Sequence, residues 1–146
     1  MRYDVLNFIE IRKQFIFFGG KMQFTINPQG SWYHGSNKVF DVLIEGSTIT
    51  QWRQLAEAFS HKPTILAIDD DNTIFHNGKE YGYLYIIDEP IEIDKDIYAH
   101  PNTTMDKGLE FLTKRKLKVK MVEEIGLPNE EQQRLSEEKL KQWLCS

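Results

Sequence analysis

Short apolar runs, separated by glycine, proline and acidic residues, follow one another through most of the chain. Residues 81–87 (YGYLYII) are apolar on both faces, which predicts a strand in the centre of a sheet. Residues 111–122 alternate between apolar side chains and lysines, and this period of two predicts one continuous strand with a buried face and a basic, solvated face. Further short strands are expected over residues 23–26, 31–34 and 39–44.

A hairpin is expected in the middle of the chain, where residues 64–68 and 73–76 predict two strands joined by a turn at residues 69–72. That acidic turn lacks the ligand spacing and terminal glutamate of a calcium loop. Asn77-Gly78 is a second hairpin signal, because both residues accept the positive φ of a tight turn. Residues 88–108 are acidic and then rich in turn residues, and they predict a long loop.

Two segments have helical spacing. Residues 51–60 place Trp52, Leu55, Ala56 and Phe59 on one face, and Pro63 ends the pattern. A last helix is expected to open at Pro128, with early glutamates and late lysines that complement the helix dipole. Its buried stripe is predicted to consist of Leu135, Leu140, Trp143 and Leu144. Strands and helices together predict a β-rich α+β domain.

Residues 1–21 differ from the rest in being strongly apolar and aromatic, and they end at Gly19-Gly20-Lys21-Met22. Those four residues could be encoded by a purine-rich stretch that ends in a start codon. A bacterial ribosome-binding site looks like this when it is translated. One hypothesis is that translation starts naturally at Met22 and that residues 1–21 are a translated leader. The alternative is a genuine N-terminal helix or strand that packs on the domain. Residues 22–146 are expected to form a single domain.

Composition narrows the class of protein. A chain of 146 residues fits one domain with one core. Its formal net charge of −4 gives no general attraction to nucleic acid or anionic membranes. Cys145 is the single cysteine and no Cys/His spacing predicts a zinc site, which favours a reducing cytoplasm and no metal. No apolar run is long enough to span a bilayer, so no membrane association is expected. His61, His76 and His100 are scattered and predict no ligand pair.

The most informative motif is Tyr33-His34-Gly35-Ser36 at the end of a predicted strand. Ser47-Thr48-Ile49-Thr50 follows before the first predicted helix, and the strand at residues 82–87 ends in Glu89-Pro90. In this order the segments resemble the motifs of the ADP-ribosyltransferase superfamily. At motif level they are similar to the small rifamycin ADP-ribosyltransferases, which have aromatic-His-Gly-Thr, then Tyr-hydrophobic-Thr before an Ala-rich helix, then a Gly-aromatic strand ending in Glu-Pro. The resemblance covers residues 32–122.

The resemblance implies a split half-barrel of two small sheets that clasp NAD between them, and an NAD-dependent ADP-ribosyltransferase without a metal. It implies that Tyr33, His34, Gly35 and Ser36 bind NAD, together with Ser47 and Thr48. The His34 imidazole would bond a ribose hydroxyl, and the Gly35 backbone would pair with the nicotinamide amide. Glycine would be required there because a side chain would block the ligand. Ser36 would hold His34 or reach the ligand.

One position departs from the rifamycin enzymes. Their second motif supplies a tyrosine that stacks on nicotinamide, and Thr48 occupies the matching place here. Ser47-Thr48 is similar instead to the Ser-Thr-Ser motif of the arginine-modifying branch. Stacking is then left to Trp32, Tyr33 or Phe59, each of which could equally belong to the core.

A carboxylate is the main chemical requirement, because cleavage of the nicotinamide–ribose bond passes through an oxocarbenium-like state. Glu110 opens a predicted strand and resembles the third-motif glutamate of the superfamily. Asp96 resembles the aspartate of the rifamycin enzymes by its spacing from Glu89-Pro90. Glu110 is preferred, since the end of a strand fixes a side chain better than a loop does.

Four functions remain open, and one of them is an NAD glycohydrolase toxin. The first is ADP-ribosyl transfer from NAD to an unidentified protein, nucleic acid or small-molecule acceptor, whose choice residues 88–108 would shape. The second is a non-catalytic module that binds NAD or a partner. The third is an NAD-using RNA 2′-phosphotransferase, which would require cations to hold an RNA phosphate. The lysine stripe at residues 114–120 is the visible candidate for such cations, although such a stripe usually protects a solvated edge strand. The oligomeric state is not predicted.

Overall fold

The computed structural model describes residues 2–5, 14–17, 25–101, 103 and 108–145. Within these ranges it contains the helices α1 (Arg53–Ser60), α2 (Ile93–Asp96) and α3 (Glu130–Leu144). The strands are β1 (Arg2–Val5), β2 (Gln14–Phe17), β3 (Tyr33–Ser36), β4 (Val42–Leu43), β5 (Thr48–Ile49), β6 (Ile65–Ile68), β7 (Ile74–His76), β8 (Gly82–Ile87), β9 (Ile97–Ala99), β10 (Phe111–Thr113) and β11 (Leu117–Gly126).

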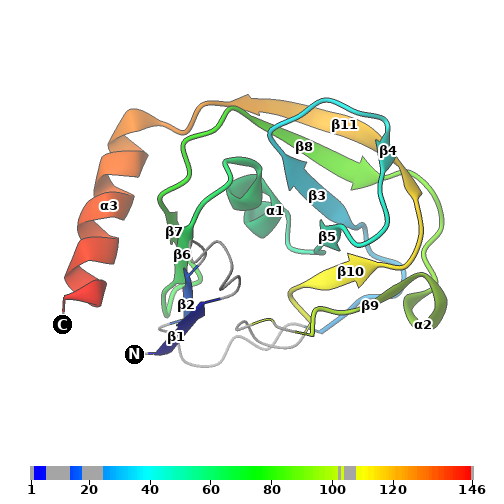
Figure 1. Ribbon diagram of the computed structural model, residues 1–146, viewed down its shortest axis with the longest axis horizontal. Helices are drawn as coiled ribbons and strands as arrows, with labels where there is room; N and C mark the ends of the chain where they lie inside the picture. The colour runs from blue at the N-terminus through cyan, green and yellow to red at the C-terminus, as the bar shows by residue number, and fades with distance from the viewer. Residues whose placement is uncertain (1, 6–13, 18–24, 102, 104–107, 146) are drawn as a thin grey trace.

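The described strands form three sheets, with the orders β3-β8-β11-β4, β5-β10-β9 and β1-β2-β6-β7. In Figure 1 the long pair β8 and β11 runs along one edge of the molecule, with β10 and β9 beneath it and α3 at the opposite end. The first two sheets curl around a common interior. The predicted α+β class is therefore confirmed, as a strand-rich fold with a curled half-barrel sheet.

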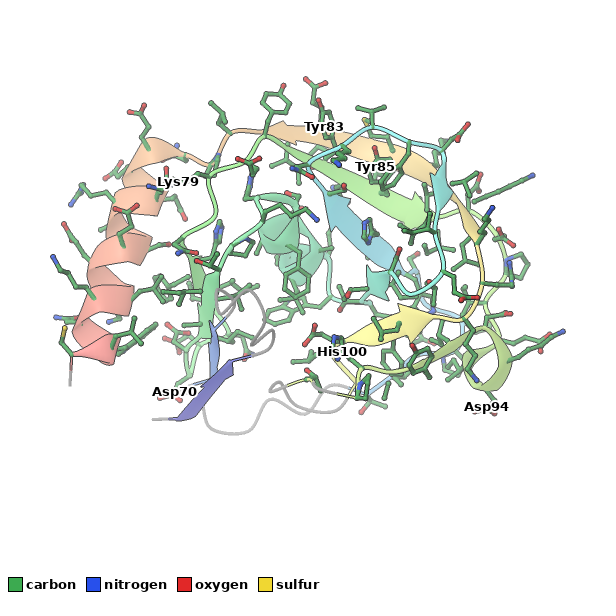
Figure 2. All side chains as sticks on the ribbon, in the orientation of Figure 1. Asp70, Lys79, Tyr83, Tyr85, Asp94 and His100 are labelled. Atoms are coloured by element: carbon green, nitrogen blue, oxygen red, sulfur yellow. The ribbon has the colours of Figure 1, made fainter. Side chains whose placement is uncertain are left out.

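Strand β8 is central, as predicted, because it pairs with β3 on one side and with β11 on the other. Tyr83 and Tyr85, labelled in Figure 2, both belong to this strand. Tyr85 is fully buried and joins a core cluster that includes Trp32 and Phe111, whose rings meet edge to face at 5.2 Å. This cluster fills the space between the first two sheets and fixes their separation.

The prediction of one strand over residues 111–122 is wrong. The chain bends at residues 114–116, so that β10 lies in one sheet and β11 in another. The bend is stabilised by Arg115, whose guanidinium pairs with Glu89 at 2.7 Å and with Asp96 at 2.9 Å. Within β11 the predicted alternation begins correctly, since Leu117 and Val119 are buried and Lys118 and Lys120 are exposed.

The hairpin of β6 and β7 around residues 69–72 is confirmed, but the hairpin turn at Asn77-Gly78 is wrong. Strands β7 and β8 lie in different sheets. The Asn77 side chain accepts hydrogen bonds from the backbone N–H groups of Thr64 and Ile65, each at 2.9 Å. It therefore ties the chain back to the start of β6 instead of reversing it.

Other element boundaries also differ from expectation. The expected loop at residues 88–108 contains α2 and β9. The strand expected at residues 39–44 is reduced to β4, residues 25–26 are irregular, and residues 23–24 lie outside the described ranges. Helix α1 begins two residues later than expected, at Arg53.

Helix α3 begins at the cap Asn129, whose side chain accepts from Glu131 N and Gln132 N. Its buried face contains Ser136 and Leu140, and Trp143 packs edge to face on Phe75 of β7. Leu135 and Leu144 are 45% and 38% exposed, so half of the predicted stripe is wrong.

The described parts of residues 1–21 form β1 and β2, and β2 lies parallel to β6 with Gln14 opposite Ile65. This pairing extends the β6–β7 hairpin into a four-stranded sheet. The site of translation initiation stays a prediction. Among the helices of the described residues, none combines the length and the apolar composition that crossing a membrane requires.

Candidate functional site

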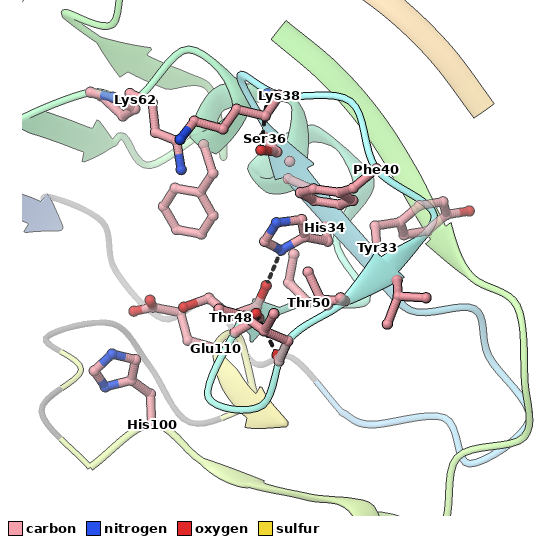
Figure 3. Close-up of a pocket in the computed structure, with 18 residues that line it drawn as sticks. Tyr33, His34, Ser36, Lys38, Phe40, Thr48, Thr50, Lys62, His100 and Glu110 are labelled. Carbon is pink, nitrogen blue, oxygen red and sulfur yellow. Dashed lines mark hydrogen bonds between the residues drawn. The ribbon is translucent and has the colours of Figure 1, made fainter. Parts of the chain in front are cut away.

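A cavity of about 600 Å³ opens beside β3, within the range of roughly 300 to 1,000 Å³ of small-molecule sites. Its walls come from β3, from β4 and the chain on either side of it, from β5, from α1 and from Glu110 (Figure 3). Every residue of the predicted NAD-binding set lines it: Tyr33, His34, Gly35, Ser36, Ser47 and Thr48. Glu110 lines the same cavity, and Asp96 does not.

Strand β3 is an edge strand of its sheet, and its free edge begins to pair with the chain that follows β5. Tyr33 and Thr50 exchange two backbone hydrogen bonds, of 2.7 and 3.0 Å. In a regular antiparallel ladder the next exchanging pair would be Gly35 and Thr48. The His34 ring takes that place instead, because its Nδ1 bonds the Thr48 carbonyl oxygen at 2.7 Å.

The Gly35 peptide groups consequently point to an open edge. The bond from Ile87 N to Trp32 O fixes the ladder with β8, so that His34 and Ser36 are its hydrogen-bonded residues. The N–H and C=O of Gly35 then face away from β8, toward the cavity. Within the described part of the chain, neither group has a hydrogen-bond partner. Together they present one donor and one acceptor to a ligand.

The structure shows a requirement for glycine at position 35 that the sequence analysis did not predict. A Cβ built on Gly35 would lie 1.8 Å from Ala56 O and 2.7 Å from Ser60 N, both in the backbone of α1. Position 35 therefore requires glycine because α1 packs directly on β3. The close helix contact and the peptide groups that face the cavity are two separate properties of the same residue.

His34 is held neutral. Its pKa is lowered from 6.5 to about 4, mainly by burial and to a smaller extent by the charge of Lys62, while the bond to Thr48 acts in the opposite direction. Because the Thr48 carbonyl can only accept, Nδ1 carries the proton and Nε2 is an acceptor. Nε2 makes no hydrogen bond to any described residue, so it is available to a hydroxyl donor in the cavity.

Glu110 directly precedes β10 and is 4% exposed. Its carbonyl oxygen accepts from His100 N at 3.1 Å, and its Oε1 accepts from the Thr103 hydroxyl at 2.5 Å. Figure 3 shows Glu110 on the opposite side of His34 from Lys38. The sheet containing β10 thus brings a carboxylate to the cavity whose other wall is β3.

The hydroxyl residues of the predicted set brace the cavity wall. The Ser47 hydroxyl donates to Ile44 O, and Ser47 N donates to the Thr113 hydroxyl. Thr48 pairs with Leu112 in the sheet and holds His34 through its carbonyl. Ser36 is buried and its hydroxyl accepts from Lys38 N, which bends the chain after β3.

Asp96 lies in a different part of the molecule. Its carboxylate accepts from Arg115 Nε and from Glu92 N, and these two interactions hold its pKa below the ordinary range of an aspartate. It lines another cavity, together with Lys95 and Arg115. The geometry gives it a role in joining α2 to the bend between β10 and β11.

The cavity lining that sequence reasoning missed includes two cations and an aromatic ring: Lys38, Lys62 and Phe40. The Phe40 ring lies 5.9 Å from the His34 ring and stacks on Tyr85 at 4.6 Å. Among the predicted aromatic residues, Trp32 is in the core, whereas Tyr33 and Phe59 line the cavity. All three missed residues lie in irregular segments of the structure. Phe40 belongs to the part of the expected strand at residues 39–44 that does not form, and no periodic pattern marks the two lysines.

A second cavity, of about 400 Å³, lies between α1, β7 and α3. Contrary to the expectation of scattered histidines, His61 and His76 stack there with ring centroids 5.5 Å apart. The pKa of His76 is lowered to about 4, first by burial and then by the neighbouring His61. In the described residues no three His, Cys, Asp or Glu side chains are grouped to hold a metal ion.

Comparison with protein-family models, with curated proteins and with solved structures finds no significant match to this chain. The resemblance to ADP-ribosyltransferases therefore rests on the motifs quoted above.

Proposed function

We propose that the chain is an ADP-ribosyltransferase that uses NAD as its substrate. The observation that carries this proposal is the open peptide of Gly35 beside the His34 imidazole. A primary carboxamide such as that of nicotinamide matches one backbone donor and one backbone acceptor. His34 Nε2 adds an acceptor for a ribose hydroxyl, and the Phe40 ring supplies an aromatic surface next to it.

Glu110 supports a group transfer instead of binding alone. In the transfer, the bond between ribose C1′ and the nicotinamide ring nitrogen breaks, and its electron pair leaves on neutral nicotinamide. The acceptor nucleophile bonds to C1′ and releases its proton. Positive charge develops on the ribose during this step, and a buried carboxylate in the same cavity stabilises it.

The RNA 2′-phosphotransferase alternative requires cations in this cavity. The lysines of β11 are exposed and are absent from its lining, whereas Lys38 and Lys62 are present. Two lysines fit a phosphate group of NAD as well as they fit RNA, so they do not favour that alternative.

The test is nicotinamide release from NAD, measured beside NAD binding, with His34→Ala, Glu110→Gln and the surface control Glu131→Gln. We expect Glu110→Gln to bind NAD and to slow release about 100-fold or more. His34→Ala should weaken binding about tenfold or more, and Glu131→Gln should match the wild type.

NAD binding without nicotinamide release by the wild type would favour the non-catalytic module. No NAD binding at all, with a folded protein, would refute the proposal.

A further inference from the structure

We propose that Lys38 and Lys62 form a subsite for the diphosphate of the dinucleotide, an inference that rests on the proposed function. Both lysines line the cavity, on the far side of His34 from Glu110 (Figure 3). They come from separate segments, one after β3 and one after α1. Their ammonium groups match the charge of a diphosphate, for which lysine acts as a compact point charge.

The charge of the cavity differs in sign from that of the whole chain. Its described lining contains two lysines against one glutamate, whereas the chain has a formal net charge of −4. The positive charge of Lys62 also acts at His34, whose pKa it lowers. An anionic ligand is attracted to the side of the cavity where two ammonium groups lie.

Lys62 holds its position in an unfavourable backbone conformation. Its φ is +53°, a left-handed value at the position after a helix where glycine is usual. The same turn directs His61 to the second cavity and Lys62 to the first. A lysine at such a position is explained if its side chain has a function there.

Lys38 is fixed by a buried side chain. The Tyr85 hydroxyl donates to Lys38 O at 2.7 Å and accepts from Phe40 N at 3.1 Å. Tyr85 is fully buried in β8, so it anchors this exposed segment to the central strand. The Lys38 side chain itself makes no hydrogen bond or ion pair with a described residue.

The experiment is calorimetric titration of the purified chain with NAD, nicotinamide riboside and inorganic pyrophosphate. Nicotinamide riboside lacks the diphosphate. We expect Lys38→Gln and Lys62→Gly each to weaken NAD and pyrophosphate binding about tenfold, and to leave nicotinamide riboside binding unchanged. The wild-type affinity for NAD should fall as salt rises, because an exposed ion contact is screened.

Two matched controls separate charge from structure. Lys120→Gln removes an exposed lysine outside the cavity. Asn72→Gly relieves the other non-glycine residue with positive φ in the described chain, in the β6–β7 turn. Both should bind NAD as the wild type does.

The outcomes distinguish this inference from the proposed function. If Lys38→Gln and Lys62→Gly bind NAD like the wild type while His34→Ala does not, the diphosphate subsite is refuted and the function stands. If the wild type binds pyrophosphate through both lysines but neither NAD nor nicotinamide riboside, the anion subsite stands and the proposed function fails.

Discussion

Gly35 is constrained from two directions. On one side the backbone of α1 occupies the space of a side chain, and on its edge the peptide groups face the cavity. A substitution here therefore acts first on the packing of β3 against α1, and only then on the site. Stability and ligand binding are coupled at this one residue.

We expect Gly35→Ala to destabilise the fold by about 3 kcal/mol, at the upper end of the usual cost of overpacking, because the obstructing atoms are backbone. Gly46→Ala is the matched control. Gly46 has φ of +83° with open space around it, so only backbone strain of about 1 kcal/mol should appear. Urea denaturation measures both. Equal costs for the two variants would contradict the close contact between β3 and α1.

At the residue scale, sequence reasoning identified the motif residues that line the cavity but not its lysines. Motif order singled out His34, Thr48 and Glu110, and these three residues line a common cavity. It missed Lys38 and Lys62, because their positions depend on a tyrosine hydroxyl and on a left-handed backbone. Neither feature leaves a periodic trace in the sequence.

At the scale of elements, long-range polar contacts override local patterns. The alternation over residues 111–122 is real, yet Arg115 is drawn to Glu89 and Asp96 and bends the strand. The Asn77 side chain likewise accepts a hydrogen bond from the backbone just before β6, and this contact overrides the local turn signal. The hydrophobic pattern could predict that strands exist here, and β8 in particular. It could not predict which sheet each strand joins, because partners distant in the sequence decide that.

The variant Asp96→Asn tests whether Asp96 stabilises the bend between β10 and β11. We expect the thermal midpoint to fall by about 5 °C, because a charged hydrogen bond to Arg115 is lost from a buried carboxylate. The rate of nicotinamide release per folded molecule should not change. A large loss of that rate, with the midpoint preserved, would restore Asp96 as a catalytic candidate.

At the scale of the whole molecule, two histidines in separate cavities make stability depend on pH. The pKa values of His34 and His76 are about 4 when folded, against 6.5 as the ordinary value. Between these values the unfolded chain binds more protons, so stability should fall as the pH drops from about 6.5 to about 4. Glu89 and Asp96 have lowered pKa values, and their contribution is lost only at lower pH.

Urea denaturation at pH 7, 5.5 and 4.5 measures this effect, with His76→Gln beside the wild type. We expect the variant to lose less stability over this interval, since one of the two histidines no longer titrates. An identical loss in both proteins would show that His76 is not held neutral by the fold.

The His34 ring separates β3 from the chain around β5, which would otherwise continue to pair with it through backbone hydrogen bonds. With Tyr33 and Thr50 already paired, Gly35 and Thr48 are in register for the next rung. The imidazole bonds the Thr48 carbonyl oxygen in place of the Gly35 peptide, so the two chain segments stay apart at this position. A small residue at position 34 would allow Gly35 and Thr48 to form their backbone hydrogen bonds. The sheet would then be more continuous, and the binding site would be lost. The opening is thus maintained by one side chain against the tendency of the backbone to seal it.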